Sequence, residues 1–176
     1  FIGASSKNLP ENTAQVMFTG IQVIDPEIFE RIPSGQFYGT TEDVFPKMVE
    51  DGLPVYGYLH KGYWKDMGNR ENYLQVNIDA LDGKVRLKGM PSYDSNEHLI
   101  IPPVLIGNNC RISESAQIGP HTIIGPNCTI KNGTLIENSI LWEGATIGSD
   151  SKITRSIIAQ NSTVDTGKDI NEKSVV

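Results

Sequence analysis

Residues 106–135 read IGNNCR ISESAQ IGPHTI IGPNCT IKNGTL, and this stretch decides the fold of the second half of the chain. Each block of six opens on isoleucine and carries a small residue four places later. Such regularity indicates a repeat architecture in which each repeat contacts its neighbours. A period of six drifts against the 3.6-residue period of an α-helix, so the pattern predicts stacked strands rather than helices.

The spacing of the repeat changes farther along the chain. The step from Ile136 to Leu141 is five residues, and so is the step from Ile153 to Ile158, with steps of six between them. The segments IENSILWEGATI and ITRSIIAQNSTV therefore match at a distance of 17 residues. The sequence predicts coils of 18 residues followed by coils of 17, each made of three strand-and-corner units.

These coils are expected to be triangular, with inward isoleucines stacked at the strand spacing of about 4.8 Å. Gly, Asn and Pro supply tight turns, and small residues such as Cys110, Ala116, Thr122 and Cys128 fit near the corners. The pattern resembles the left-handed parallel β-helix of hexapeptide-repeat proteins, and the left hand is taken from that resemblance. We expect Cys110 and Cys128 to be buried free thiols rather than a disulfide.

The first half of the chain has an α/β pattern. Strands are expected over 16–24 and 55–59 and from Tyr63, and helices from Thr40 to Gly52 and from an N-cap at Asn69 to Gly83. These elements are too few to close a sheet by themselves. Residues 84–97 show no period and read as a linker. The predicted organisation is an α/β part over 1–83, a linker over 84–97 and a β-helix over 98–176.

Composition excludes several classes of partner. The chain has 15 Lys and Arg against 21 Asp and Glu, a net charge of -6, and no basic run, so we expect no nucleic acid partner. No stretch approaches the roughly 18 apolar residues that cross a bilayer, and the start lacks the layout of a signal peptide. Two cysteines in 176 residues agree with a reducing compartment. We expect a soluble, cytoplasmic protein.

Three segments carry a resemblance to a known family: FTGIQVIDPEIF, TTEDVFPKMVEDGLPVYGY and GYWKDMGNRENYLQVN. Together they resemble the latter part of the sugar-1-phosphate nucleotidyltransferases, most of all mannose-1-phosphate guanylyltransferase and its bacterial relatives, which often end in a hexapeptide β-helix. The most specific element is GYWKDMGN, which is similar to the family's YWxDIGT. The resemblance implies a reaction that joins an NTP and a sugar 1-phosphate into an NDP-sugar and pyrophosphate.

The chain departs from the family pattern at its N-terminus. The family's Gly-rich phosphate-binding loop of the GxGTRLxPLT type is absent, and so is the aspartate that supplies its other metal ligand. We therefore expect a C-terminal portion that is inactive alone and completed by a nucleotide-binding half. The residues that read the base would lie in that half, so the base and the sugar stay open, with the GDP-mannose type as the first expectation.

The resemblance also assigns site residues. Asp66 matches the family aspartate that binds Mg²⁺, a cation that prefers carboxylate oxygens and keeps several waters. Thr19 and Gly20 match the TGI segment that lines the sugar pocket, although Phe18 stands where relatives carry Asn. Trp64 is a candidate to pack against the sugar ring. Each has an ordinary alternative: a strand-end acid, a bulged strand or a core tryptophan. No catalytic base or nucleophile is assigned.

Other functions remain open. Hexapeptide β-helices also occur in acyltransferases, where His121 would be the candidate base, although a histidine after Pro120 at a corner is expected to be solvated. They occur as well in a zinc carbonic anhydrase class, but zinc needs about three convergent ligands, and His121 alone of the three histidines lies in the repeats. The chain is alternatively a non-catalytic assembly or regulatory module, because flat β faces suit association into a homo-oligomer.

Overall fold

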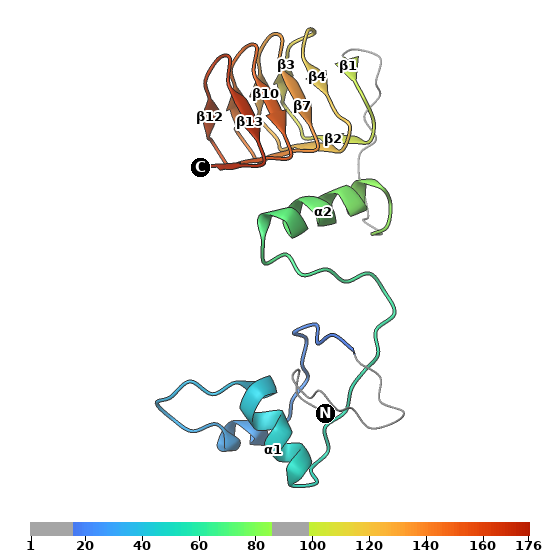
Figure 1. The fold of residues 1–176 in the computed structure, drawn as a ribbon, viewed down its shortest axis with the longest axis vertical. Coiled ribbons are helices and arrows are strands. Elements are labelled where there is room, and N and C mark those ends of the chain that lie inside the picture. Colours follow the sequence, from blue (N-terminus) through green and yellow to red (C-terminus); the bar gives the residue numbers. More distant parts are fainter. Residues whose placement is uncertain (1–15, 86–98) are drawn as a thin grey trace. The chain divides into compact units, whose positions relative to one another are not determined.

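The computed structural model describes residues 16–85 and 99–176 and divides the chain into two compact units, Phe1–Gly62 and Tyr63–Val176 (Figure 1). The second unit contains helix α2 (Arg70–Leu81) and a parallel β-helix with three sheets. Most of the predicted linker lies outside the described residues, and the predicted boundaries at 83 and 98 stay a prediction.

Each sheet of the β-helix takes one strand from each successive coil, and all neighbours are parallel. The first sheet contains β1 (Leu99–Ile100), β4 (Gln117–Ile118), β7 (Leu135–Glu137), β10 (Lys152–Thr154) and β13 (Asp169–Asn171). The second contains β2 (Val104–Ile106), β5 (Thr122–Ile124), β8 (Ile140–Leu141), β11 (Ile157–Ile158) and β14 (Ser174–Val175). The third contains β3 (Arg111–Ile112), β6 (Thr129–Ile130), β9 (Thr146–Ile147) and β12 (Thr163–Val164).

The strand register confirms the predicted change in coil length. Ile118 pairs with Ile136, which is a coil of 18 residues, and Ile136 pairs with Ile153, which is a coil of 17. The coil of 17 continues from Ile153 to Ile170. The missing residue is lost at one corner, between the first and second sheets, where Asn138, Arg155 and Glu172 adopt positive φ values of 50°, 45° and 53°.

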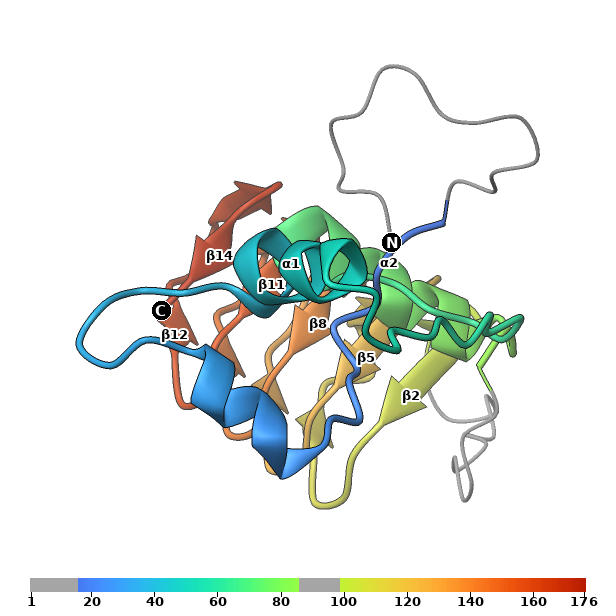
Figure 2. The same ribbon diagram turned by 90° about the horizontal axis from the view of Figure 1, so that it is seen from below.

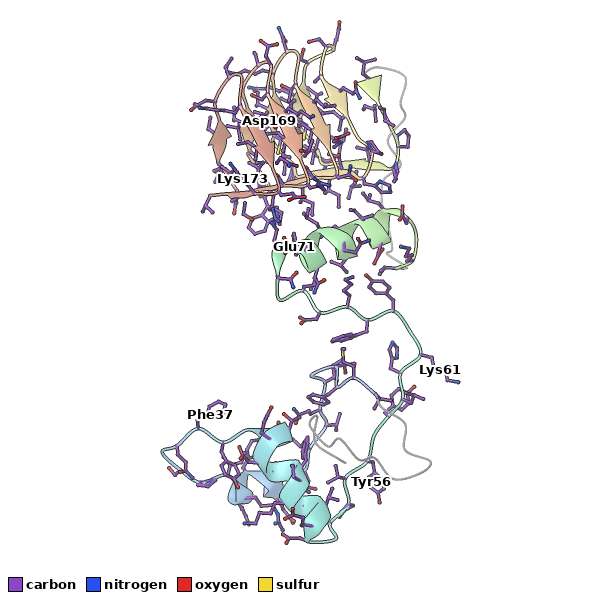
Figure 3. The ribbon with its side chains drawn as sticks, in the orientation of Figure 1. Phe37, Tyr56, Lys61, Glu71, Asp169 and Lys173 are labelled. Carbon is purple, nitrogen blue, oxygen red and sulfur yellow. The ribbon has the colours of Figure 1, made fainter. Side chains whose placement is uncertain are left out.

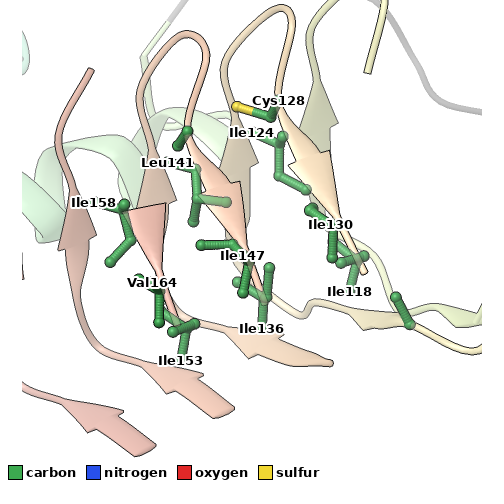
Figure 4. Packing of buried hydrophobic residues seen from close by; sticks show 12 residues of the cluster. Ile118, Ile124, Cys128, Ile130, Ile136, Leu141, Ile147, Ile153, Ile158 and Val164 are labelled. Atoms are coloured by element: carbon green, nitrogen blue, oxygen red, sulfur yellow. The ribbon is translucent and has the colours of Figure 1, made fainter. Parts of the chain in front are cut away.

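The core of the β-helix is the predicted inward column of aliphatic side chains (Figure 4). Ile118, Ile136, Ile147, Ile153 and Ile158 are fully buried. Burying one such side chain contributes about 1.5–3 kcal/mol to the free energy of unfolding. Because alternate residues of a strand point to opposite faces, one inward aliphatic residue in each short strand is enough to build this column.

Small polar side chains inside the corners form hydrogen bonds with backbone groups of their own coil and of the next one. The Thr122 hydroxyl lies 3.1 Å from the Pro120 carbonyl oxygen and 3.3 Å from that of Ile136 in the next coil. The Ser156 hydroxyl donates to the Thr154 carbonyl at 2.7 Å and accepts from the Lys173 N–H at 3.1 Å. A buried hydroxyl without a partner costs about 1–3 kcal/mol, so these hydrogen bonds allow Thr122 and Ser156 to be buried at the corners.

Cys110 and Cys128 occupy equivalent corner positions and are free thiols, as predicted. Their sulfur atoms lie 3.1 Å from the carbonyl oxygens of Gly125 and Trp142, the same role that hydroxyls play at the other corners. Burial raises the pKa of both thiols, that of Cys128 to about 11. They are therefore structural fillers rather than nucleophiles.

The first unit contains helical elements around a small core. These are η1 (Pro26–Arg31), η2 (Thr40–Val44) and α1 (Phe45–Glu50), which bury Ile28, Val44 and Phe45. The helix predicted after Thr40 is confirmed, and α1 ends at Glu50, two residues before Gly52, where φ is 71°. Gly39 rather than Thr40 precedes the first turn, and its N–H donates to the Asp43 carboxylate at 2.7 Å.

The predicted strands of the first half do not form, since residues 16–25 and 53–69 contain no strand. A strand needs a neighbour for its backbone groups, and these segments have none among the described residues. Their side chains consequently stay exposed: Val23 is 99% and Tyr58 91% exposed. Figure 3 shows Tyr56 and Phe37 projecting from this unit in the same way.

Truncating one inward isoleucine tests the predicted core. We expect Ile136→Ala to lower the free energy of unfolding by about 2–5 kcal/mol, because it removes buried methyl groups and leaves a cavity. Urea unfolding of the chain measures the loss. Leu99→Ala, in the same sheet at a side chain that is 58% exposed, is the control and should cost far less. Equal losses in the two variants would contradict the inward placement of Ile136.

Candidate functional site

Asp66 lies on an exposed segment that leads into α2. One oxygen of its carboxylate accepts a hydrogen bond from the Gly68 N–H at 2.9 Å. A Cβ atom at position 68 would lie 3.2 Å from that oxygen, which is a tight contact, so glycine lets the chain turn closely around the carboxylate. The side chain is exposed, and its remaining lone pairs face no donor that the structure shows. This arrangement leaves the carboxylate able to bind a cation.

The segment that carries Asp66 is attached to α2 at both ends. At its far end, the Asn69 side chain accepts from the Asn72 N–H at 2.8 Å and caps the helix, as predicted. At its near end, the Tyr63 hydroxyl donates to the Asp79 carboxylate at 2.7 Å. Asp66 stands between the two attachments, so its backbone is held from both sides.

Asp79 is the centre of a polar cluster on α2. It is 6% exposed and accepts hydrogen bonds from Tyr63, from Gln75 at 2.9 Å and from Lys84 at 2.6 Å. The Lys84 ammonium, followed by the Tyr63 hydroxyl, holds the pKa of the Asp79 carboxyl well below its usual range. Burial, together with the neighbouring carboxylate, raises the pKa of Tyr63 to about 12. At neutral pH the pair is therefore a neutral hydroxyl donating to a carboxylate.

Side chains at both ends of α2 contact the β-helix. The Tyr73 and Trp142 rings meet edge to face, with centroids 6.3 Å apart. At the other end, His121 Nε2 lies 3.0 Å from an oxygen of Asp82, the residue that follows α2. His121 is thus partly covered, with 29% of its side chain exposed, which corrects the prediction of a solvated histidine.

The second sheet carries an outward column of apolar residues beneath this helix. Figure 2 shows α2 lying over β5, β8 and β11. The inward residues of these strands and of the neighbouring β2 belong to the core. The residues that alternate with them face outward: Leu105, Ile123, Ile140 and Ile157. Ile140 is only 5% exposed although it lies outside the inner cluster. Trp142 and this column were the sequence signals of a docked element, and the sequence prediction missed them.

The other predicted site residues fall in both units. Thr19 is half-buried, and Gly20 has a φ of 81° with open space where a Cβ would lie. These two belong to the first unit, whereas Trp64 and Asp66 belong to the second. Trp64 is 38% exposed, so it is no core tryptophan. Their roles in binding stay predictions.

The described residues offer few alternative sites. No group of three or more His, Cys, Asp and Glu in 16–85 and 99–176 is placed to hold a metal ion. Two open hollows of about 340 and 410 Å³ lie on the outer faces of the β-helix, and neither is lined by Asp66. In the same part of the chain, no helix is long and apolar enough to span a bilayer.

Comparison with known proteins places both halves of the chain. Residues 8–83 match the family model described as nucleotidyl transferase, and residues 100–176 match the one described as GMPPB C-terminal domain. The chain belongs to the sugar-1-phosphate nucleotidyltransferase family. The predicted fold class, the latter part of an α/β nucleotidyltransferase domain followed by a parallel β-helix, is thereby confirmed.

Individual relatives of this family act on different sugars and nucleotides. A UTP–glucose-1-phosphate uridylyltransferase of Synechocystis is 31% identical over 156 residues, which cover 80% of this chain and 40% of the relative. A glucose-1-phosphate adenylyltransferase of Clostridium botulinum is 31% identical over 66% of this chain and 28% of its own length. A mannose-1-phosphate guanylyltransferase of Mycobacterium tuberculosis is 26% identical over 73% of this chain and 34% of its own. The chain thus spans less than half the length of these nucleotidyltransferases.

The contact between Tyr73 and Trp142 yields a measurable prediction for this family member. We expect a double-mutant cycle with Tyr73→Leu and Trp142→Leu to give a coupling free energy of about 0.5–1.5 kcal/mol, the value of an aromatic pair. Urea unfolding measures each variant. The matched control pairs Tyr73→Leu with Thr163→Ala on the third sheet and should give additive losses. Additivity in the Tyr73 and Trp142 cycle would contradict the docking of α2.

The buried Asp79 carboxylate predicts an acid dependence of stability. Because its folded pKa is lowered from 3.8, its contribution is present above that value and is lost as the pH falls below it. We expect the urea midpoint to fall steeply between about pH 5 and pH 2, and to fall less steeply in Asp79→Asn. If the urea midpoint depends on pH in the same way in both proteins, protonation of Asp79 is not a cause of the acid dependence.

Proposed function

We propose that the chain is part of an enzyme that forms an NDP-sugar and pyrophosphate from an NTP and a sugar 1-phosphate, with GDP-mannose as the product. The observation that carries the reaction class is the GYWKDMGN segment, whose Asp66 is exposed on a loop fixed at both ends. The mannose type is supported by the resemblance of the three segments, by the GMPPB C-terminal domain match and by the guanylyltransferase relative.

Asp66 would be this chain's ligand to Mg²⁺ in the complete enzyme. The fit is good because Mg²⁺ takes one or two carboxylates and completes its shell with water and substrate phosphates. When bound, the ion would neutralise charge that builds on the phosphates. Asp66 offers such a carboxylate, and the Gly68 N–H fixes its orientation without closing it off.

Thr19, Gly20 and Trp64 would bind the sugar. Gly20 leaves open space where any other residue would place a Cβ, so a ligand could approach the backbone there. Trp64 has enough exposed surface to stack on a sugar ring. Neither proposal requires these residues to take part in bond making.

The acyltransferase alternative is weaker. It needs His121 as a base, but in the structure Nε2 of this histidine contacts Asp82 and links α2 to the β-helix. We retain the proposal that the β-helix supports a homo-oligomer, because parallel sheets end in strands with unpaired edges. Analytical ultracentrifugation of the complete parent protein tests it, and a monomer at high concentration would contradict it.

The catalytic proposal is tested with the complete parent protein. Pyrophosphate release is measured with GTP and mannose 1-phosphate, and with UTP or ATP and glucose 1-phosphate. We expect the first pair to be preferred and Asp66→Asn to lower kcat by about 100-fold or more while the protein stays folded.

Glu50→Gln, which changes an exposed acid on α1, is the control and should keep full activity. A preference for glucose 1-phosphate would contradict the GDP-mannose proposal and would favour the formation of UDP-glucose or ADP-glucose instead. An unchanged rate in Asp66→Asn would overturn the assignment of the metal ligand.

A further inference from the structure

The hydrogen bonds of Asp79 differ in what they connect. Gln75 lies one turn earlier on α2, and Lys84 lies three residues after the end of the helix, so these two donors are local. Tyr63 is 16 residues away and belongs to the segment that carries Asp66. The non-local hydrogen bond of this buried carboxylate therefore fixes the segment that carries the proposed metal ligand.

A buried carboxylate contributes little net stability to a helix. The desolvation of the charge offsets most of what its partners contribute, and an apolar residue of similar size often stabilises as well or better. Asp79 and Leu74 are the two buried residues of α2, and an apolar side chain like that of Leu74 is the usual choice for such a position. An apolar residue could not accept a hydrogen bond from the Tyr63 hydroxyl, so it could not fix the position of Tyr63.

Helix α2 is itself held by the β-helix. Its contacts through Tyr73 to Trp142 and through Asp82 to His121 lie toward opposite ends of the helix. A site built on such an anchored element is placed more accurately than one on a free loop, because the supporting groups are locked. The β-helix, α2, Asp79 and Tyr63 therefore form a continuous support beneath the segment that holds Asp66.

We propose that Asp79 is a positioning residue that holds the Tyr63 hydroxyl and thereby sets the place of the Asp66 carboxylate for Mg²⁺. The inference rests on the proposed function. It assigns no chemical step to Asp79, which touches neither the substrate nor the metal. Its effect is to reduce the range of positions that the Asp66 backbone can take.

Tyr63→Phe is the decisive variant, because it removes one hydroxyl and leaves Asp79 with Gln75 and Lys84. In the complete parent protein we expect kcat to fall by about 10–100-fold, as for groups that orient metal ligands, with little change in KM for the sugar 1-phosphate. The Mg²⁺ concentration for half-maximal rate should rise. Mn²⁺ affinity, followed by its electron paramagnetic resonance signal, should fall by a similar factor and gives a readout independent of turnover.

Hydrogen–deuterium exchange shows whether the segment has moved. We expect amides 64–68 to exchange faster in Tyr63→Phe and at the wild-type rate in Gln75→Leu, the control that removes a local hydrogen bond to Asp79. Asp79→Asn keeps an acceptor for Tyr63 and should lose less activity than Asp79→Ala. The double variant Tyr63→Phe with Asp79→Ala should be no worse than Asp79→Ala alone.

The outcomes separate this inference from the proposed function. If Asp66→Asn is inactive and Tyr63→Phe has the wild-type kcat and Mn²⁺ affinity, the positioning role is overturned and the metal ligand stands. If Tyr63→Phe and Gln75→Leu lose activity equally, Asp79 acts through the stability of α2, and the inference also fails. Full activity in Asp66→Asn overturns both proposals together.

Discussion

The structure of the second unit depends on the pairing of each coil with the next. A strand of two or three residues has no stability alone, and it forms because equivalent residues lie 17 or 18 positions away on either side. The same spacing places the inward isoleucines in one column, the corner hydroxyls in another and the outward apolar residues in a third. One constraint on coil length therefore fixes the core, the corners and the apolar surface on which α2 lies.

That surface links the repeat to the chemistry proposed for this family member. The β-helix carries none of the residues assigned to substrate or metal, yet it holds the helix to which the Asp66 segment is attached. Its contribution is mechanical: it supplies a wide, rigid base for a short segment that has few contacts of its own. The separation of scaffold and chemistry into different parts of one chain agrees with the general behaviour of such folds.

The features that could be predicted from sequence are those set by local periodicity. The inward residues, the five-residue steps, the free cysteines and the cap at Asn69 follow from spacing and residue type. The docking of α2 was missed although the predicted register already places Ile123 and Ile140 on the outer face, where apolar side chains indicate a covered surface but do not identify the element that covers it. Asp79 was missed because an acid within a helix usually faces solvent, and its burial depends on Tyr63, far away in the chain.

The strands predicted in the first half failed for a related reason. Residues such as Val23 and Tyr58 have strand propensity, but propensity becomes structure only when a neighbouring strand accepts the backbone hydrogen bonds. The roles proposed for Thr19, Gly20 and Trp64 likewise depend on the residues that surround them in space, which the local sequence does not specify. In the β-helix, each strand pairs with the equivalent strand one coil away. In the α/β part, a strand depends on neighbours from other segments of the protein.

The five-residue corner at Asn138, Arg155 and Glu172 has an evolutionary consequence. A coil can lose a residue there without rotating any strand, since the inward column resumes in register on the next sheet. Deletions of this kind are absorbed within one turn, so they should accumulate at this corner among descendants of a common ancestor. Whole coils can likewise be duplicated or lost, which lets the β-helix change length over generations while the face of the second sheet beneath α2 keeps its shape.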